Sequence, residues 1–286
     1  MERFAIVVDG TASFAPGMER ELDIRKLPLH VDIGPDSYTA EVDLSADEFY
    51  KKIAAPNVKP GTSQPSMGEC RDVYEKLVSE GLRKMVVLTI ASELSGTYSV
   101  ASTTAQQMDG TRIVVVDSRT LAGGIALIAT ACARARRAGR SFDDAAAIAQ
   151  RLAGKTRIIA AADGLEYLRR SGRISGGAAL FGSLLAVKPI LAVEDGRVDA
   201  IDRVRTREKA TARVKELIEE KLPPGSKVNA CTLHTNDPER ARALGDWAQE
   251  RFHCLEHWVA EAGPVIGARA GPGVIGLCWY RSEEVQ

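Results

Sequence analysis

The sequence has few aromatic residues and no excess of charge of either sign. Phe, Trp and Tyr together make up 5% of the 286 residues, and 38 Lys and Arg balance 38 Asp and Glu. A protein that binds nucleic acid in bulk needs a cationic excess, and one that holds single strands also needs aromatic stacking platforms. We therefore expect no nucleic-acid partner.

Cysteine and histidine are also scarce and scattered. The five cysteines are widely spaced, odd in number and form no CxxC pair, and the four histidines do not stand at metal-ligand spacing with carboxylates. These patterns favour a reducing compartment and argue against a disulfide framework or a zinc site. We expect no metal and no cofactor.

Long apolar runs are missing as well. The two most apolar stretches, residues 120–133 and 174–187, are each 14 residues long and contain glycine. A membrane helix needs about 20 apolar residues, and the N-terminus moves directly into a strand-like run without the apolar core of a signal peptide. The sequence therefore predicts a cytoplasmic protein without stable membrane insertion.

What is present in the first half is an alternation of strand and helix signals. Continuous apolar runs at 4–8, 85–90 and 113–116 are typical of strands buried on both faces of a parallel sheet. Helix signals lie between and after them, at 121–138 and in three possible capping boxes, whose first residues are Ser45, Ser66 and Ser141. This alternation predicts an α/β/α sandwich.

The regular alternation of strand and helix signals ends near residue 155. Strand signals at 157–161, 187–193, 198–204, 228–234, 255–261 and 274–280 are mixed with helix signals at 165–170 and 208–222. Asp195-Gly196 suits a hairpin turn, and Asp237-Pro238 suits a helix start. We predict an N-terminal domain over residues 1–155 and a smaller C-terminal α/β domain with a mixed sheet over 156–286.

Three segments could bind a carboxylate or phosphate at the ends of parallel strands or at helix N-termini. They are Asp9-Gly10-Thr11, Ser92 to Thr97, and Gly61 to Ser66, and they offer hydroxyls and backbone N–H groups. The alternative is that each is an ordinary set of caps and turns. There is no GxxxxGK[ST] motif and no GxGxxG motif after the first strand, and Ser95 is not in a GxSxG elbow.

Two further features involve arginine. The stretch from Gly263 to Gly273 is predicted to be a loop, in which Arg269 could pair with a carboxylate or simply be solvated. Residues 165–215 carry eleven Lys and Arg against six acids, so this segment is +5 and the remainder −5. Such a segment is by default a solvated face, whereas alternation over Arg203, Arg205 and Arg207 would place all three on one face of a strand, as a docking or anion-binding surface.

Taken in order, the motifs resemble the DegV family, which includes the FakB fatty-acid carriers. The resemblance covers essentially the whole chain. It rests on these segments: Asp9-Gly-Thr11, Thr62-Ser-Gln-Pro-Ser66, Leu94-Ser-Gly-Thr-Tyr98, Asp117-Ser118, Leu165–Ser175, Leu185–Leu191, Arg203–Ala210 and Gly263-Pro-Val-Ile-Gly267.

This resemblance implies a function. The family buries a long-chain fatty acid such as palmitate between an N-terminal α/β/α domain and a smaller C-terminal domain, and FakB-type members present it to a fatty-acid kinase that makes acyl phosphate. Hydroxyls matching Thr62 and Ser95 hold the carboxylate, with the Gly96 region close by. Arginines matching Arg173 and Arg205 are implicated in docking the kinase. Where this chain has Arg269 the family usually has His.

We accordingly expect a monomeric lipid-binding carrier without catalytic residues of its own. Its fatty-acid site would consist of Thr62, Ser63, Ser95, Gly96 and Arg269, and the Gly176–Leu185 segment could line part of the tunnel. The alternative is a serine-dependent acyl hydrolase or transferase, which would need a histidine within reach of Ser95.

Overall fold

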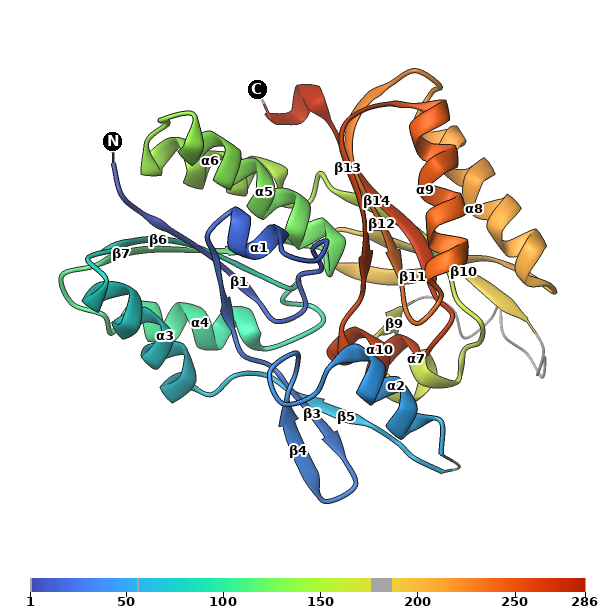
Figure 1. The fold of residues 1–286 in the computed structure, drawn as a ribbon, viewed down its shortest axis with the longest axis horizontal. Helices are drawn as coiled ribbons and strands as arrows, with labels where there is room; N and C mark the ends of the chain where they lie inside the picture. The colour runs from blue at the N-terminus through green and yellow to red at the C-terminus, as the bar shows by residue number, and fades with distance from the viewer. Residues whose placement is uncertain (1, 56, 176–186, 286) are drawn as a thin grey trace.

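The N-terminal half is built on a four-stranded parallel sheet (Figure 1). The computed structural model describes residues 2–55, 57–175 and 187–285. The strand order is β2-β1-β6-β7, with every neighbouring pair parallel. The strands are β1 Ala5–Asp9, β2 Ile24–Leu27, β6 Lys84–Thr89 and β7 Arg112–Asp117. The three strands predicted from apolar runs are confirmed, whereas β2 was not predicted.

Helices cover both faces of this sheet, which confirms the predicted α/β/α sandwich. Val7 and Val87 face α3 and α4, while Val8 and Leu88 face α5 and α6. The predicted capping boxes at Ser45, Ser66 and Ser141 are present and start α2, α3 and α6. The helices of this half are α1 Met18–Glu21, α2 Ala46–Ile53, α3 Met67–Ser79, α4 Thr97–Ala105, α5 Gly123–Arg137 and α6 Phe142–Leu152.

The C-terminal half carries a seven-stranded mixed sheet in the order β13-β12-β14-β8-β10-β11-β9. Its strands are β8 Arg157–Ala161, β9 Ile174–Ser175, β10 Lys188–Glu194, β11 Arg197–Val204, β12 Lys227–His234, β13 His253–Glu261 and β14 Ile275–Arg281. The predicted Asp195-Gly196 turn joins β10 to β11, with both residues at positive φ. The mixed sheet confirms the predicted fold class; the division at residue 155 stays a prediction.

Helices α8 Arg207–Lys221 and α9 Pro238–Arg251 pack on one face of the mixed sheet, and α9 begins with the predicted Asp237 cap. Its other face meets α5, which lies between the two large sheets (Figure 1). A Cβ on Gly123 of α5 would lie 2.9 Å from Cys231 Sγ and 3.1 Å from Cys278 Sγ. Helix α5 therefore belongs to the core of both halves.

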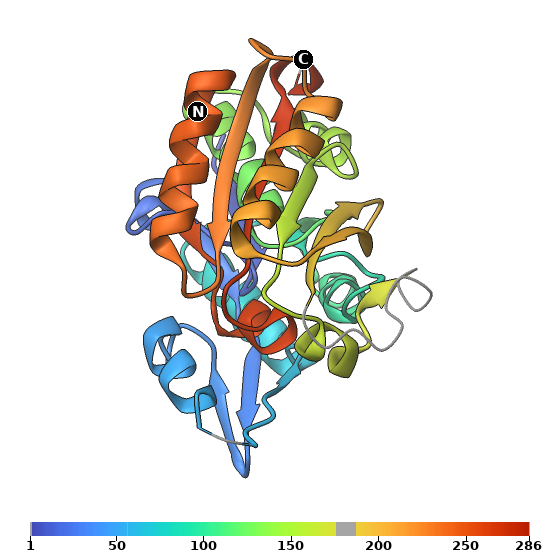
Figure 2. The same ribbon diagram turned by 90° about the vertical axis from the view of Figure 1, so that its right-hand side faces the viewer.

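A small third sheet was not predicted. Strands β3 His30–Ile33, β4 Asp36–Thr39 and β5 Gly61–Ser63 pair antiparallel in the order β4-β3-β5 and protrude with α2 at the lower end of the molecule (Figure 2). Helix α2 packs against α10, Pro264–Ala270, where a Cβ on Gly267 would lie 2.7 Å from the Phe49 ring. This contact places β5 beside α10.

Two predictions about local structure were wrong. The stretch from Gly263 to Gly273, expected to be a loop, contains α10, which starts with Pro264 in its first turn. Arg203, Arg205 and Arg207 do not share a strand face, because β11 ends at Val204 and Arg207 opens α8. The Gly176–Leu185 segment, predicted to line the tunnel, lies outside the described residues. The remaining short helices are α7 Glu166–Ser171 and η1 Ser282–Val285.

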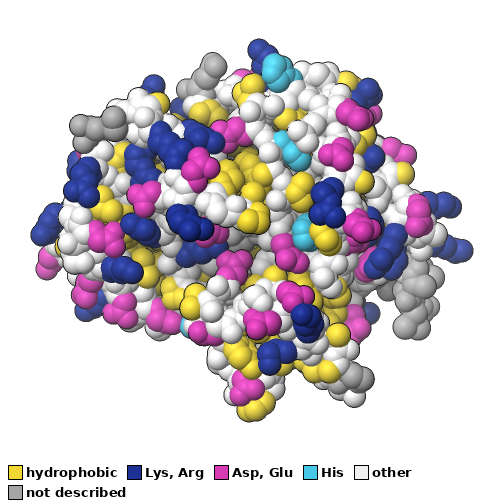
Figure 3. Space-filling view, viewed as in Figure 1, with side chains coloured by type: hydrophobic (Ala, Val, Ile, Leu, Met, Phe, Trp, Pro, Cys, Tyr) yellow, Lys and Arg dark blue, Asp and Glu magenta, His cyan; other side chains and the backbone are white. Residues whose placement is uncertain are grey.

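The surface reflects the balanced charge of the sequence. On the face seen in Figure 3, acidic side chains lie among the basic ones over α5 and α6. Arg134 pairs with Glu256, and Arg140 with Asp144, so these cations are partly neutralised. Within the described part of the chain, no helix is long and apolar enough to cross a membrane.

Candidate functional site

A cavity of about 330 Å³ lies between the two large sheets, with its polar end bounded by β5 and α10. This volume falls in the range of about 300 to 1,000 Å³ that is usual for small-molecule sites. Most of the wall is aliphatic. These lining residues are Leu29, Ile90, Leu94, Leu121, Ile158, Ala160, Leu168, Leu191, Val193, Val198, Leu233, Ala262, Val265, Ile266, Ala270 and Val274.

The polar end of the cavity brings together all five residues predicted to bind the fatty acid. Thr62 and Ser63 come from β5, Ser95 and Gly96 precede α4, and Arg269 lies on α10. These side chains are separated by up to 207 positions in the chain. Their shared location is a property of the fold, and their role in binding a carboxylate stays a prediction.

Arg269 is a charged group at this polar end. Its Nε donates to Thr62 Oγ1 at 2.8 Å, and its Nη2 donates to the Thr62 carbonyl at 3.2 Å. Burial, then repulsion from Arg173 and Arg170, lowers the pKa of this guanidinium, while Asp32 acts in the opposite sense. Within the described residues no carboxylate lies at ion-pair distance from Arg269, so the site has an unmatched cation.

The start of α4 forms the opposite side of the polar end. The Ser95 hydroxyl lies 2.8 Å from Thr97 Oγ1 and accepts the Thr97 N–H at 3.3 Å. A Cβ on Gly96 would lie 2.2 Å from Gln64 Oε1, so only glycine allows the Gln64 amide to rest on the helix start. Backbone N–H groups at a helix N-terminus favour an anion.

Asp9 fixes the strand ends beneath the cavity. Its Oδ1 accepts the Thr11 N–H at 2.9 Å and its Oδ2 accepts the Ile90 N–H at 2.5 Å. Burial of this carboxyl raises its pKa, and the three hydrogen bonds from Ile90 and Thr11 oppose that rise. Asp9 thus ties β1 to the residue after β6, and Thr11 reaches the cavity wall.

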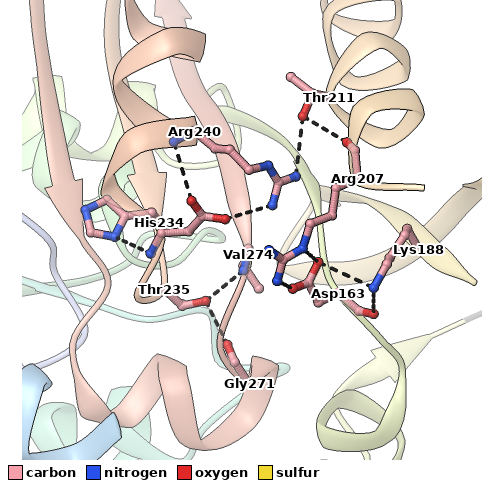
Figure 4. A network of polar contacts seen from close by, with 10 residues as sticks. Asp163, Lys188, Arg207, Thr211, His234, Thr235, Arg240, Gly271 and Val274 are labelled. Atoms are coloured by element: carbon pink, nitrogen blue, oxygen red, sulfur yellow. Dashed lines mark hydrogen bonds and ion pairs between the residues drawn. The ribbon is translucent and has the colours of Figure 1, made fainter.

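The two arginines predicted to dock a kinase lie in different surroundings. Arg173 lines the cavity, where it donates to the Ser171 carbonyl at 2.7 Å. Arg205 is exposed between β11 and α8, away from the cavity lining. Its neighbour Arg207 is held by Asp163, which also lies near Lys188 (Figure 4). Arg205 is therefore an exposed cation outside the cavity lining.

The geometry does not assemble a serine nucleophile. In the described part of the chain the Ser95 hydroxyl pairs with Thr97 and with no histidine. No group of three or more potential metal ligands is found among the described residues. Gln64 and His234 also line the cavity and were not among the predicted site residues, although Gln64 stands within the Thr62–Ser66 motif.

Comparison with known proteins gives a consistent result over the whole chain. Residues 3–282 match the family described as "uncharacterised protein, DegV family". A DegV domain-containing protein of Halalkalibacterium halodurans is 34% identical, covering 98% of this chain and 99% of that protein. One of Streptomyces coelicolor is 36% identical, covering 96% of each chain.

Solved structures show the same architecture. A DegV family protein from Thermus thermophilus, described by its fatty-acid binding, superposes with a TM-score of 0.89 at 29% identity, covering 98% of this chain and 100% of that one. A DegV lipid-binding protein from Thermotoga maritima also gives 0.89, at 26% identity, covering 98% and 99%.

Proposed function

The chain belongs to the DegV family, and on this premise we propose that it binds a long-chain fatty acid such as palmitate in the cavity between its two large sheets. The observation that carries the proposal is the half-buried Arg269 guanidinium, which has no carboxylate at ion-pair distance within the described residues and stands at one end of an aliphatic cavity. A ligand with one carboxylate and a long apolar chain satisfies both ends.

The polar end would hold the carboxylate by charge-assisted hydrogen bonds. Arg269 would donate through the guanidinium, and the Thr62 and Ser95 hydroxyls would exchange their present partners for the carboxylate oxygens. Ser63 and Gly96 line the same end, where the Gln64 amide rests on the start of α4. Hydrogen bonds to charged groups are shorter and stronger than neutral ones, so a few contacts suffice to fix the head group.

The aliphatic wall would supply most of the affinity. Each buried methylene contributes about 0.8 kcal/mol, against an estimated cost of 4 to 15 kcal/mol for lost freedom of motion on association. A chain of about 14 methylenes therefore offsets this cost only if most of it enters the cavity. This reasoning favours long chains over short ones.

The protein would act as a monomeric cytoplasmic carrier rather than an enzyme. Arg205 and Arg173 would form the surface that meets a fatty-acid kinase, with Arg173 close enough to the cavity to lie near the bound carboxylate. The two domains, divided near residue 155, would enclose the ligand between them. The relatives described as fatty-acid-binding proteins support the carrier role.

Native mass spectrometry of the purified protein tests the proposal. We expect an adduct with the mass of a fatty acid, which dissociates on activation, and stoichiometric exchange with labelled palmitate. Thr62→Val should weaken palmitate binding while Ser45→Ala, a matched loss of a hydroxyl at the start of α2, should leave it unchanged. A protein that purifies empty and ignores palmitate would refute the proposal.

A further inference from the structure

A second cavity lies between α5, α6, η1 and the face of the mixed sheet that α5 covers, and we call it the groove. Its volume is about 950 Å³, within the usual range for small-molecule sites. Figure 1 shows η1 between α6 and the upper end of β13, where its residues line one side of the groove. Leu233 of β12 lines the lipid cavity, and Asn229 of the same strand lines the groove, about 13 Å away along the strand. The groove is therefore separate from the lipid cavity.

The floor of the groove is a cross-strand row of polar side chains. Asn229 in β12 pairs with Tyr280 in β14 on one side and with Glu256 in β13 on the other. Successive side chains of a strand alternate between the two faces of the sheet. Asn229 is two residues from Cys231, and Tyr280 is two residues from Cys278. The thiols of both cysteines meet α5, so the side chains of Asn229 and Tyr280 face α5 as well.

Several polar side chains that line the groove have no partner among the described residues. Tyr280 is 4% exposed, yet its hydroxyl makes no hydrogen bond to them. The side chains of Asn229, Ser282 and Lys227 are likewise without a hydrogen bond or ion pair in the described part of the chain. Burial, followed by the nearby Glu256, raises the pKa of Tyr280 well above its usual range, so the hydroxyl stays protonated and can donate. A buried tyrosine hydroxyl normally has a hydrogen-bond partner, which a bound molecule would supply.

The groove also carries a surplus of positive charge. The charged residues that line it are four basic and two acidic ones, Arg134, Arg140, Arg151, Lys227, Asp144 and Glu256. Glu256 accepts from Arg134 Nε at 2.8 Å, and Asp144 lies 3.4 Å from Arg140, so each carboxylate is matched by one cation. Lys227 and Arg151 remain as the surplus, with Arg151 donating to the Val285 carbonyl. A phosphate monoester carries a charge of about −1.5 to −2 at pH 7, which complements this surplus.

We propose that the groove binds the phosphate ester of a sugar, either free or as part of a nucleotide. Lys227 and Arg151 would pair with the phosphate. Tyr280, Asn229 and Ser282 would exchange hydrogen bonds with the sugar hydroxyls. Alanines of α5 and α6 line the remaining wall and offer an apolar surface to the sugar or to a base. A fatty acid would leave the floor hydroxyls against methylenes, so the groove suits a different class of ligand from the lipid cavity. This inference does not depend on the proposed fatty-acid binding.

Isothermal titration calorimetry of the full chain with AMP, ribose 5-phosphate and adenosine tests the proposal. At least one of the two phosphates should bind. Adenosine should bind at least about 12-fold more weakly than AMP, because it lacks the charge-assisted hydrogen bonds to the phosphate. The two phosphates separate the two sources of the ligand: tighter binding of AMP indicates a nucleotide, and equal or tighter binding of ribose 5-phosphate indicates a sugar phosphate.

Tyr280→Phe removes only the hydroxyl, which has no partner among the described residues. It should weaken binding of the phosphate about 2- to 12-fold, the range for one neutral hydrogen bond, without lowering the free energy of unfolding. Tyr74→Phe is the matched control, because its buried hydroxyl donates to the Ala101 carbonyl at 3.3 Å and does not line the groove. Tyr74→Phe should leave the affinity for the phosphate unchanged. Palmitate affinity, measured by displacement of a fluorescent fatty acid, should be the same in both variants as in the wild type.

A footprint on the wild-type protein needs no variant to fold. Acetylation of the exposed Lys227 by acetic anhydride, read by peptide mass spectrometry, should slow when the phosphate is bound. Lys209, an exposed lysine of α8 on the other face of the mixed sheet, should react at an unchanged rate.

Three results would overturn the inference: neither phosphate binds at millimolar concentration, adenosine binds as tightly as AMP, or binding changes with neither Tyr280→Phe nor the reactivity of Lys227. Each of them leaves the proposed fatty-acid binding in place. Failure of palmitate to bind would refute that function and leave the groove as a phosphate site.

Discussion

Replacement of Arg269 by methionine should lower the affinity for palmitate strongly while changing the free energy of unfolding of the ligand-free protein only slightly. The side chain is half-buried, it donates to Thr62, and no carboxylate within the described residues lies at ion-pair distance. Its removal loses hydrogen bonds worth about 1 kcal/mol net, but also relieves repulsion from Arg173. The ligand-free protein should therefore change in unfolding free energy by less than about 1 kcal/mol.

The effect on ligand binding should be much larger. A hydrogen bond to a charged partner contributes about 1.5 to 3 kcal/mol, which corresponds to a loss of roughly 12- to 140-fold in palmitate affinity. At a palmitate concentration of 100 times the wild-type Kd, the ligand stabilises the wild-type protein by about 2.7 kcal/mol. A 30-fold weaker variant at the same concentration gains only about 0.9 kcal/mol.

Thermal or chemical unfolding with and without palmitate measures both quantities in one series. Arg269→Lys is the matched control, since it keeps the charge and loses the planar fork, and it should fall between the wild type and Arg269→Met. If Arg269→Met binds palmitate as tightly as the wild type, the guanidinium does not hold the head group. If it loses as much stability without palmitate as with it, Arg269 is a structural residue.

Three further predictions concern the wall, the partner surface and a helix cap. Val193→Phe should shift the preference toward shorter chains, with palmitate affinity falling about fourfold for each methylene excluded, measured against decanoate in the same displacement assay. Arg205→Glu should leave palmitate affinity unchanged and reduce kinase-dependent acyl-phosphate formation about tenfold; an unchanged rate would remove Arg205 from the partner surface. Ser66→Ala should lower the unfolding free energy by about 1 kcal/mol through the lost capping box, without altering palmitate affinity.

Local signals in the sequence predicted local structure well. The capping boxes at Ser45, Ser66 and Ser141 and the Asp237-Pro238 pair mark helix starts because the side chain that caps and the N–H that it caps lie within three residues. Buried parallel strands were predicted for a similar reason, since a continuous apolar run records burial on both faces.

Two of the elements that were not predicted, β4 and α10, lack a clear local signal. In β4 there is no apolar run, and in α10 the helix-boundary residues lie among glycines that are typical of a loop. Strand β4, with the sequence Asp-Ser-Tyr-Thr, is short, polar and largely exposed, so no apolar run announces it. The glycines around helix α10 are typical of a loop, although Pro264 in its first turn and Gly271 just after its end are normal helix-boundary residues. Proline at the start and glycine after the end are therefore the sequence signal for this helix.

The site itself could be predicted only in part. The segments that line the polar end were candidates because Ser, Thr and Gly cluster there at strand ends and helix starts, where anions bind, and the choice of Thr62 and Ser95 within them followed from the family resemblance. That Arg269 contacts Thr62 depends on the packing of α2 and β5 against α10, which no periodicity encodes.

The packing of α5 bears on how a ligand reaches the cavity. Residues of α5 are buried against β1 on one side and against β12 and β14 on the other, and Gly123 allows the close approach to Cys231 and Cys278. Spreading the two large sheets apart would expose this shared core, at about 25 cal/mol for each Å² of apolar surface. The polar end is held by hydrogen bonds between half-buried groups, Arg269 and Thr62, which exchange with water at much lower cost. The fold therefore favours entry and exit at the polar end, where Ser63 and Gln64 are exposed, over a hinge motion of the two halves.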